Sequence, residues 1–129
     1  MASRGRGARA KGFQFERDIA KELSDATGFE FKRGLGQTRG GGGEVPDVVP
    51  PPFIGELVHI ECKRQKSCSV KGAMKQADED IAKRIASAEV SITPVPIAIT
   101  KDDRKDTIVT MKLNDFLPLF KAWVTQLEQ

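Results

Sequence analysis

Apolar residues near the start of the chain recur at the spacing of one helical face: Phe15, Ile19, Ala20, Leu23 and Ala26. Residues three and four apart lie on one side of a helix, so this stripe predicts a helix over about 12–27. Gly28 follows it, at a position where glycine commonly ends a helix. Residues 29–33 then alternate apolar and polar side chains, which predicts a half-buried strand. The glycine-rich segment 34–43 predicts a loop, because regular structure is entropically costly for glycine.

A second helical stripe follows two short strand-like segments: Met74, Ala77, Ile81, Ile85 and Ala88. The remaining pattern predicts strands over 45–49 and 57–63, a helix over 72–88, strands over 96–100 and 107–112, and a last helix from about Asn114. Three consecutive prolines, residues 50–52, end the strand before them. The resulting order, α-β-β-β-α-β-β-α, predicts an α/β fold in which helices flank a mixed sheet.

Composition narrows the class of protein without identifying it. At 129 residues we expect one domain, residues 12–129, preceded by a basic flexible tail over residues 1–11. We expect a cytoplasmic protein (host cytoplasm if phage-encoded) with no membrane partner, because no long apolar run and no secretory signal stand out. Its two cysteines, Cys62 and Cys68, are then reduced thiols.

The net charge of +3 is small but unevenly distributed. Residues 1–40 hold nine Lys or Arg against five Asp or Glu, whereas residues 41–129 hold twelve against thirteen. A second basic run follows residue 62: Lys63, Arg64, Lys66, Lys71 and Lys75. Two basic segments on either side of acidic residues favour a polyanionic partner, and nucleic acid is the first candidate.

The most informative residues are Asp47 and the pair Glu61 and Lys63. Because side chains alternate along a strand, Glu61 and Lys63 project from one face of the strand over 57–63, and Cys62 projects from the apolar face. Carboxylates are hard oxygen ligands for a divalent cation. A nearby ammonium can offset the charge that develops during phosphodiester cleavage. A solvated strand face with a local ion pair remains the alternative interpretation.

Three segments together resemble the PD-(D/E)XK nuclease superfamily. They are Lys11-Gly12-Phe13-Gln14-Phe15-Glu16-Arg17-Asp18, Pro46-Asp47 and Glu61-Cys62-Lys63. Within that superfamily, the chain looks most similar to archaeal-type Holliday junction resolvases and related small phage nucleases. The resemblance implies a restriction-endonuclease-like fold with the core α-β-β-β-α-β, to which this chain adds a strand and a C-terminal helix.

The resemblance also implies a role for each residue of the motif. Asp47 and Glu61 are the expected metal ligands, with the main-chain carbonyl of Cys62, and Glu16 completes the acidic cluster. Lys63 is expected to orient or help deprotonate the attacking water. The expected cofactor is Mg²⁺, with Mn²⁺ able to substitute, because an all-oxygen donor set suits both ions.

Further residues are candidates for DNA contact: Lys11, Arg33, Arg39, Arg64 and Gln76. Glycines 40–43 permit a close approach of the backbone to a phosphate, although an idle loop explains them equally well. His59 shares the strand face of Glu61, and we interpret it as a structural histidine.

These observations predict a metal-dependent, structure-specific DNA endonuclease, with a Holliday junction resolvase as the leading hypothesis. Symmetric cleavage of a four-way junction requires two related active sites, so we expect a homodimer. The alternatives are a nuclease of the same superfamily that acts on duplex, flap or nicked DNA, and a DNA-binding module without hydrolytic activity in a recombination or packaging assembly.

Overall fold

The computed structural model describes residues 2–34, 46–55, 57–87 and 90–129. In chain order the elements are α1 (Ala2–Thr27), β1 (Lys32–Arg33), β2 (Val48–Val49), α2 (Pro52–Gly55), β3 (Val58–Gln65), α3 (Val70–Ala86), β4 (Val95–Asp102), β5 (Thr107–Thr110) and α4 (Leu113–Leu127). The predicted order is confirmed, with the four-residue helix α2 as the one addition among the described residues. The fold is α/β with a five-stranded mixed sheet, as in restriction endonucleases.

Helix α1 is longer than the sequence pattern predicts. The expected start was about residue 12 and residues 1–11 were expected to be a flexible tail, but the helix already begins at Ala2. Ala, Arg and Lys favour helix, and extending an existing helix avoids the cost of nucleation. The C-terminal end agrees with the prediction, because Gly28 has φ +78° and its N–H donates to the carbonyl of Ser24. The assignment of residues 12–129 to a single nuclease domain stays a prediction.

The sheet has the strand order β1-β2-β3-β4-β5. Strands β3 and β4 run parallel over their whole length, and every other neighbouring pair is antiparallel. Strand β4 reaches Asp102, beyond the predicted end at residue 100, because β3 continues to Gln65 and pairs with it there. Lys101 and Asp102, which fall between the two predicted strands, therefore belong to β4.

Strands β1 and β2 are only two residues long, shorter than predicted. Phe31 was expected inside the first strand, but its backbone N–H donates to the hydroxyl of Ser24 on α1 instead of to a neighbouring strand. Strand β2 meets β3 at the single register pair Val48 and Ile60, so the two strands separate almost at once. Asp47, which directly precedes β2, lies beside this part of β3.

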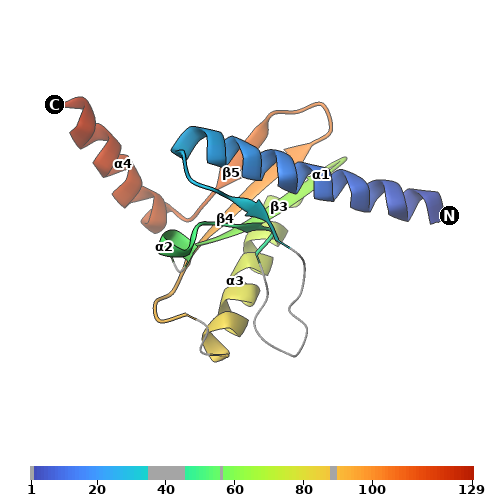
Figure 1. The fold of residues 1–129 in the computed structure, drawn as a ribbon, viewed down its shortest axis with the longest axis horizontal. Helices are drawn as coiled ribbons and strands as arrows, with labels where there is room; N and C mark the ends of the chain where they lie inside the picture. Colours follow the sequence, from blue (N-terminus) through green and yellow to red (C-terminus); the bar gives the residue numbers. More distant parts are fainter. Residues whose placement is uncertain (1, 35–45, 56, 88–89) are drawn as a thin grey trace.

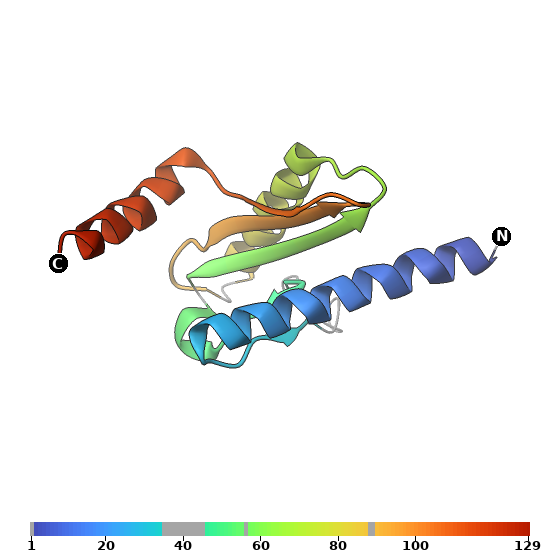
Figure 2. The same ribbon diagram turned by 90° about the horizontal axis from the view of Figure 1, so that it is seen from above.

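Helices α1 and α3 lie on opposite sides of the sheet (Figures 1 and 2). The main core cluster is on the α1 side and contains Phe15, Ile19, Ala20, Phe31, Val48, Ile60, Cys62 and Ile99. His59 and Glu61 alternate with these β3 residues, so they face the α3 side, as the strand pattern predicts.

The buried face of α3 differs from the predicted stripe. Its buried residues are Ala73, Ala77, Asp80 and Ile81, whereas Ile85 is largely exposed. The helix starts at Val70 rather than residue 72, because the Ser69 hydroxyl accepts a hydrogen bond from the Gly72 N–H and caps the first turn. A buried carboxylate, that of Asp80, therefore lies among the apolar residues of this face. Ala88, the last residue of the predicted stripe, lies outside the described residues.

Helix α4 extends away from the sheet (Figures 1 and 2). It begins at Leu113, with Lys112 as the N-cap and no capping side chain, so the predicted N-cap at Asn114 is wrong. Eight large apolar side chains on this helix are between 40% and 69% exposed: Leu113, Phe116, Leu117, Leu119, Phe120, Trp123, Val124 and Leu127. Within the described residues, no helix is long and apolar enough to cross a membrane.

Candidate active site

Asp47 lies at the point where β2 separates from β3. Its backbone N–H donates to the Ile60 carbonyl at 3.1 Å, and its Oδ2 accepts from the Cys62 N–H at 2.8 Å. The carboxylate thus occupies the hydrogen-bonding position that a longer β2 would have filled. Because N–H and C=O of a strand residue face the same side, the Cys62 carbonyl also faces this edge. The Cys62 side chain lies in the α1-side core, where burial raises the pKa of the thiol.

Glu61 is almost completely buried, with 2% of its surface exposed. Its Oε1 lies 3.0 Å from Nε2 of His59, whereas its Oε2 is buried and has no hydrogen-bond partner in the described part of the chain. Burial and the neighbouring carboxylates of Asp47 and Asp80 raise the pKa of Glu61 to about 10. An unpartnered buried carboxylate oxygen is costly unless something positively charged approaches it.

Glu16 reaches the same cluster from α1. Burial and the charge of Asp47 raise the pKa of Glu16, and its hydrogen bond with Arg33 acts in the opposite direction. The Arg33 Nε lies 3.0 Å from Glu16 Oε2. Asp47 interacts with Glu16 and also with Glu61, so it stands between these two acids.

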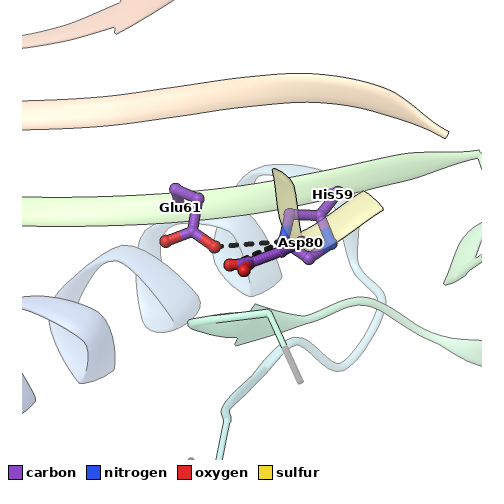
Figure 3. Close-up of side chains that lie close together, drawn as sticks. All are labelled: His59, Glu61 and Asp80. Atoms are coloured by element: carbon purple, nitrogen blue, oxygen red, sulfur yellow. Dashed lines mark hydrogen bonds and ion pairs between the residues drawn. The ribbon is translucent and has the colours of Figure 1, made fainter. Parts of the chain in front are cut away.

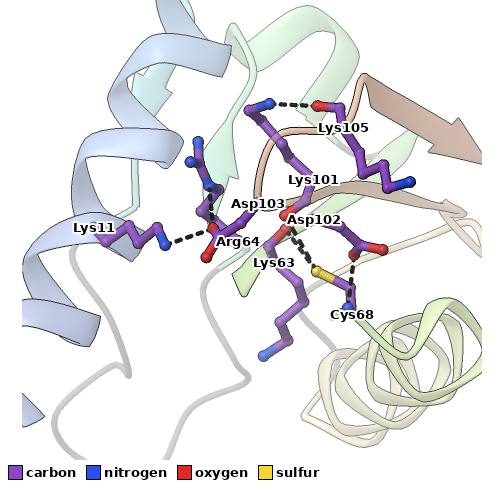
Figure 4. Close-up of polar contacts among 8 residues, drawn as sticks. All are labelled: Lys11, Lys63, Arg64, Cys68, Lys101, Asp102, Asp103 and Lys105. Carbon is purple, nitrogen blue, oxygen red and sulfur yellow. Dashed lines mark hydrogen bonds and ion pairs between the residues drawn. The ribbon is translucent and has the colours of Figure 1, made fainter. Parts of the chain in front are cut away.

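Lys63 follows Glu61 on the same strand face. Its main-chain carbonyl accepts from the Cys68 thiol at 3.4 Å, but its ammonium forms no ion pair or hydrogen bond within the residues that the structure describes. Figure 4 shows the Lys63 side chain extending away from the cluster formed by Lys11, Arg64 and Asp103. The amine therefore remains available to a ligand.

Three residues near Glu61 were not predicted as a group: His59, Asp80 and Arg84. Nε2 of His59 lies 4.0 Å from Oδ2 of Asp80 (Figure 3). Nδ1 of His59 lies 2.9 Å from Nη1 of Arg84. Burial and the charge of Arg84, opposed by that of Asp80, lower the pKa of His59 to about 4, so the ring is neutral at pH 7. The overlooked signal is the spacing of Ala77, Asp80 and Arg84, which places two charged residues on the buried stripe of α3.

The residues predicted to contact DNA lie on several elements, and the prediction that they bind DNA stays untested. Lys11 and Arg64 share Asp103 as a partner, at 2.5 and 3.5 Å (Figure 4). Arg33 is bound to Glu16 and stacks on the Phe13 ring, 4.0 Å from its centroid. Gln76 is exposed on α3, off the buried face that carries Asp80. Arg39 and the glycine segment 40–43 lie outside the described residues.

The donor set at this edge suits a hard divalent cation. Glu61 Oε2, Asp47, the Cys62 carbonyl and Glu16 all offer oxygen, the donor that Mg²⁺ prefers. A cation placed among them would relieve the repulsion that raises the pKa of Glu16 and Glu61.

Comparison with known proteins gives one finding. A family model described as "Phage putative PDDEXK endonuclease" matches residues 7–128. The searches of curated proteins and of solved structures return no significant match.

Proposed function

Because the chain belongs to this phage PDDEXK endonuclease family, we propose that it is a divalent-metal-dependent endonuclease that hydrolyses phosphodiester bonds in DNA. The observations that support the proposal are that Asp47 interacts with both Glu16 and Glu61, and that Glu61 Oε2 is buried without a hydrogen-bond partner among the described residues. A cation held by these acids would give that oxygen a partner.

The proposed roles follow from where each side chain lies. Asp47 and Glu61 hold the ion, helped by the Cys62 carbonyl and by Glu16. When bound, a divalent cation supplies positive charge that activates water and stabilises the oxygens around phosphorus. Lys63 places a compact positive charge beside the scissile phosphate and orients or deprotonates the attacking water. Mg²⁺ is the proposed ion, with Mn²⁺ as a substitute.

We further propose that the substrate is branched DNA, with the four-way junction as the leading candidate. Support comes from the resemblance of the motifs in residues 11–18, 46–47 and 61–63 to those of Holliday junction resolvases. Cutting opposed strands of a junction requires two sites related by symmetry, which a homodimer provides.

Helix α4 supplies a surface of the right size for such a dimer. Its eight exposed apolar side chains, each about half exposed, present roughly 800 Å², taking ~200 Å² for a large side chain. One partner of a standard protein interface buries about 800 Å². Beside the helix, an apolar cavity of about 360 Å³ lies against the starts of β3 and β4 and is lined by Val58, Ile97, Met111 and Leu119, among others. We propose that a second copy of the chain covers this surface.

The decisive experiment incubates the protein with labelled four-way junction, linear duplex and flap DNA, in Mg²⁺ or in EDTA. Asp47→Asn and Glu61→Gln are the test variants. Asp78→Asn is the matched control, because Asp78 is an exposed acid that pairs with Lys112 away from the cluster. Symmetric junction nicks that vanish in EDTA and in both test variants, but not in the control, support the proposal.

The other outcomes separate the alternatives. Equal cleavage of all three substrates would retain the nuclease and refute the junction preference. Tight DNA binding without cleavage in either Mg²⁺ or Mn²⁺ would refute hydrolysis and favour a binding module.

A further inference from the structure

His59 connects Glu61 to helix α3 through two hydrogen bonds. Arg84 Nη1 lies 2.9 Å from Nδ1 of the ring, and Nε2 lies 3.0 Å from Glu61 Oε1. The ring is completely buried, so water cannot substitute for either partner. Figure 3 shows Glu61, His59 and Asp80 grouped between β3 and α3.

The direction of these two bonds follows from the chemistry of the partners. A guanidinium has only donors, so Arg84 donates and Nδ1 of His59 must accept. A neutral imidazole carries its single proton on the other nitrogen, which is Nε2. Nε2 therefore donates to Glu61 Oε1, and the tautomer of His59 is fixed by Arg84.

A second interpretation treats His59 as a metal ligand. One ligand atom each from His59, Glu61 and Asp80 lie within 4.8 Å of one another, close enough to surround an ion. For Nε2 to coordinate that ion it must lose its proton while Nδ1 still faces the guanidinium, and the ring would then be an anion. Coordination through a neutral ring would require Arg84 to move away, so the observed donor arrangement opposes this interpretation.

We propose that Arg84 and His59 are positioning residues that hold Glu61 in the orientation needed to bind the divalent ion. His59 bonds to Oε1, and Oε2 is the oxygen that finds no hydrogen-bond partner in the part of the chain that the structure describes. This inference rests on the proposed metal site, because positioning matters only if Glu61 binds an ion. Partners that orient a metal ligand in this way commonly contribute 10- to 100-fold to metal affinity.

The first test reads the tautomer directly. His59 is the only histidine in the chain, so ¹⁵N-histidine labelling gives one unambiguous ring. We expect a protonated Nε2 and an unprotonated Nδ1 in the intact protein, both without metal and with saturating Mg²⁺. In Arg84→Met, both tautomers should become populated. An unprotonated Nε2 in the Mg²⁺-bound protein, or an unchanged tautomer in Arg84→Met, would overturn the proposal.

The second test measures Mg²⁺ and Mn²⁺ affinity by calorimetry in three variants. His59→Leu removes the donor and should weaken both ions by about 10- to 100-fold. His59→Gln keeps a carbonyl for Arg84 and an N–H for Glu61, so it should bind nearly as well as the wild type. Ile81→Val, a buried change on the same helix, controls for general loss of packing. Equal affinity in His59→Leu and wild type, with the variant folded by circular dichroism, would overturn the proposal.

The third test distinguishes positioning from direct coordination. In the Mn²⁺-bound protein, pulsed electron paramagnetic resonance should show no ¹⁴N coupling from a directly bound ring nitrogen. A strong coupling of that kind would make His59 a ligand and refute the positioning role. Failure of the proposed function can be told apart from failure of the positioning role. In the first case the wild type binds no divalent cation, although Nε2 of His59 is still protonated as expected.

Discussion

Replacing Glu61 with glutamine should stabilise the metal-free protein. The folded state raises the pKa of Glu61 to about 10, from about 4.5 for an ordinary glutamate. At pH 7 the folded protein therefore retains a proton that the unfolded chain releases. The contribution of the Glu61 carboxyl to the free energy of unfolding is fully present below pH 4.5 and falls as the pH rises toward 10. Glutamine is neutral at every pH, so the Glu61→Gln variant does not lose this stability as the pH rises.

The size of the effect follows from the pH interval. Each pH unit between the two pKa values changes the unfolding free energy by roughly 1.4 kcal/mol. From pH 4.5 to pH 7, the wild type therefore loses about 3 kcal/mol relative to Glu61→Gln, and from pH 4.5 to pH 5 it loses less than about 1 kcal/mol. The side chain is buried, so solvent screening reduces these values little.

Urea unfolding in EDTA at pH 5 and at pH 7 measures the difference in unfolding free energy between the wild type and Glu61→Gln at each pH. Glu79→Gln is the matched control, since Glu79 is an exposed glutamate of α3 and should change stability by less than about 0.5 kcal/mol. Adding Mg²⁺ should stabilise the wild type and leave Glu61→Gln almost unchanged. The reasoning is refuted if Glu61→Gln is less stable than the wild type at pH 7, or if the difference between them does not change with pH.

Three further predictions concern the site and the dimer. Asp47→Asn should abolish cleavage and the Mg²⁺-induced rise in melting temperature, measured by nicking assay and thermal shift; a full Mg²⁺ response would contradict its role as a ligand. Lys63→Met should lower single-turnover cleavage by about 10²- to 10⁴-fold while calorimetric Mg²⁺ affinity stays near wild type, because the amine acts on water and phosphate rather than on the ion. Trp123→Glu should convert the dimer to a monomer in sedimentation analysis, because Trp123 is 58% exposed on the apolar surface of α4. Lys121→Glu, on the same helix, is the control and should leave the dimer intact. A dimer that persists in Trp123→Glu would refute this interface.

The sequence predicts the fold well where periodicity is unambiguous. Helices α1 and α3 and strands β3 and β4 have long repeats of one period, and all four are present. The errors fall where tertiary contacts decide the outcome. Phe31 leaves the strand because Ser24 binds its backbone, and α4 begins at Leu113 without the side-chain cap expected from Asn114.

The residues of the candidate site could likewise be predicted only in part from the sequence. Short motifs with fixed spacing led to Glu16, Asp47, Glu61 and Lys63, and Asp47 interacts with both Glu16 and Glu61. Their role as a metal site stays a prediction. Asp80 and Arg84 lie about twenty residues further along, on an α3 stripe that was interpreted as apolar. Their proximity to Glu61 depends on how α3 packs on the sheet, which no local pattern encodes.

The most direct test of the metal site is anomalous diffraction from crystals of the wild-type protein grown with Mn²⁺. The account predicts a peak among Asp47, Glu61 Oε2 and the Cys62 carbonyl, at oxygen-ligand distances of about 2.0–2.6 Å. No peak at this edge of β3 at saturating Mn²⁺, or an ion bound elsewhere without contact to Asp47 and Glu61, would contradict it.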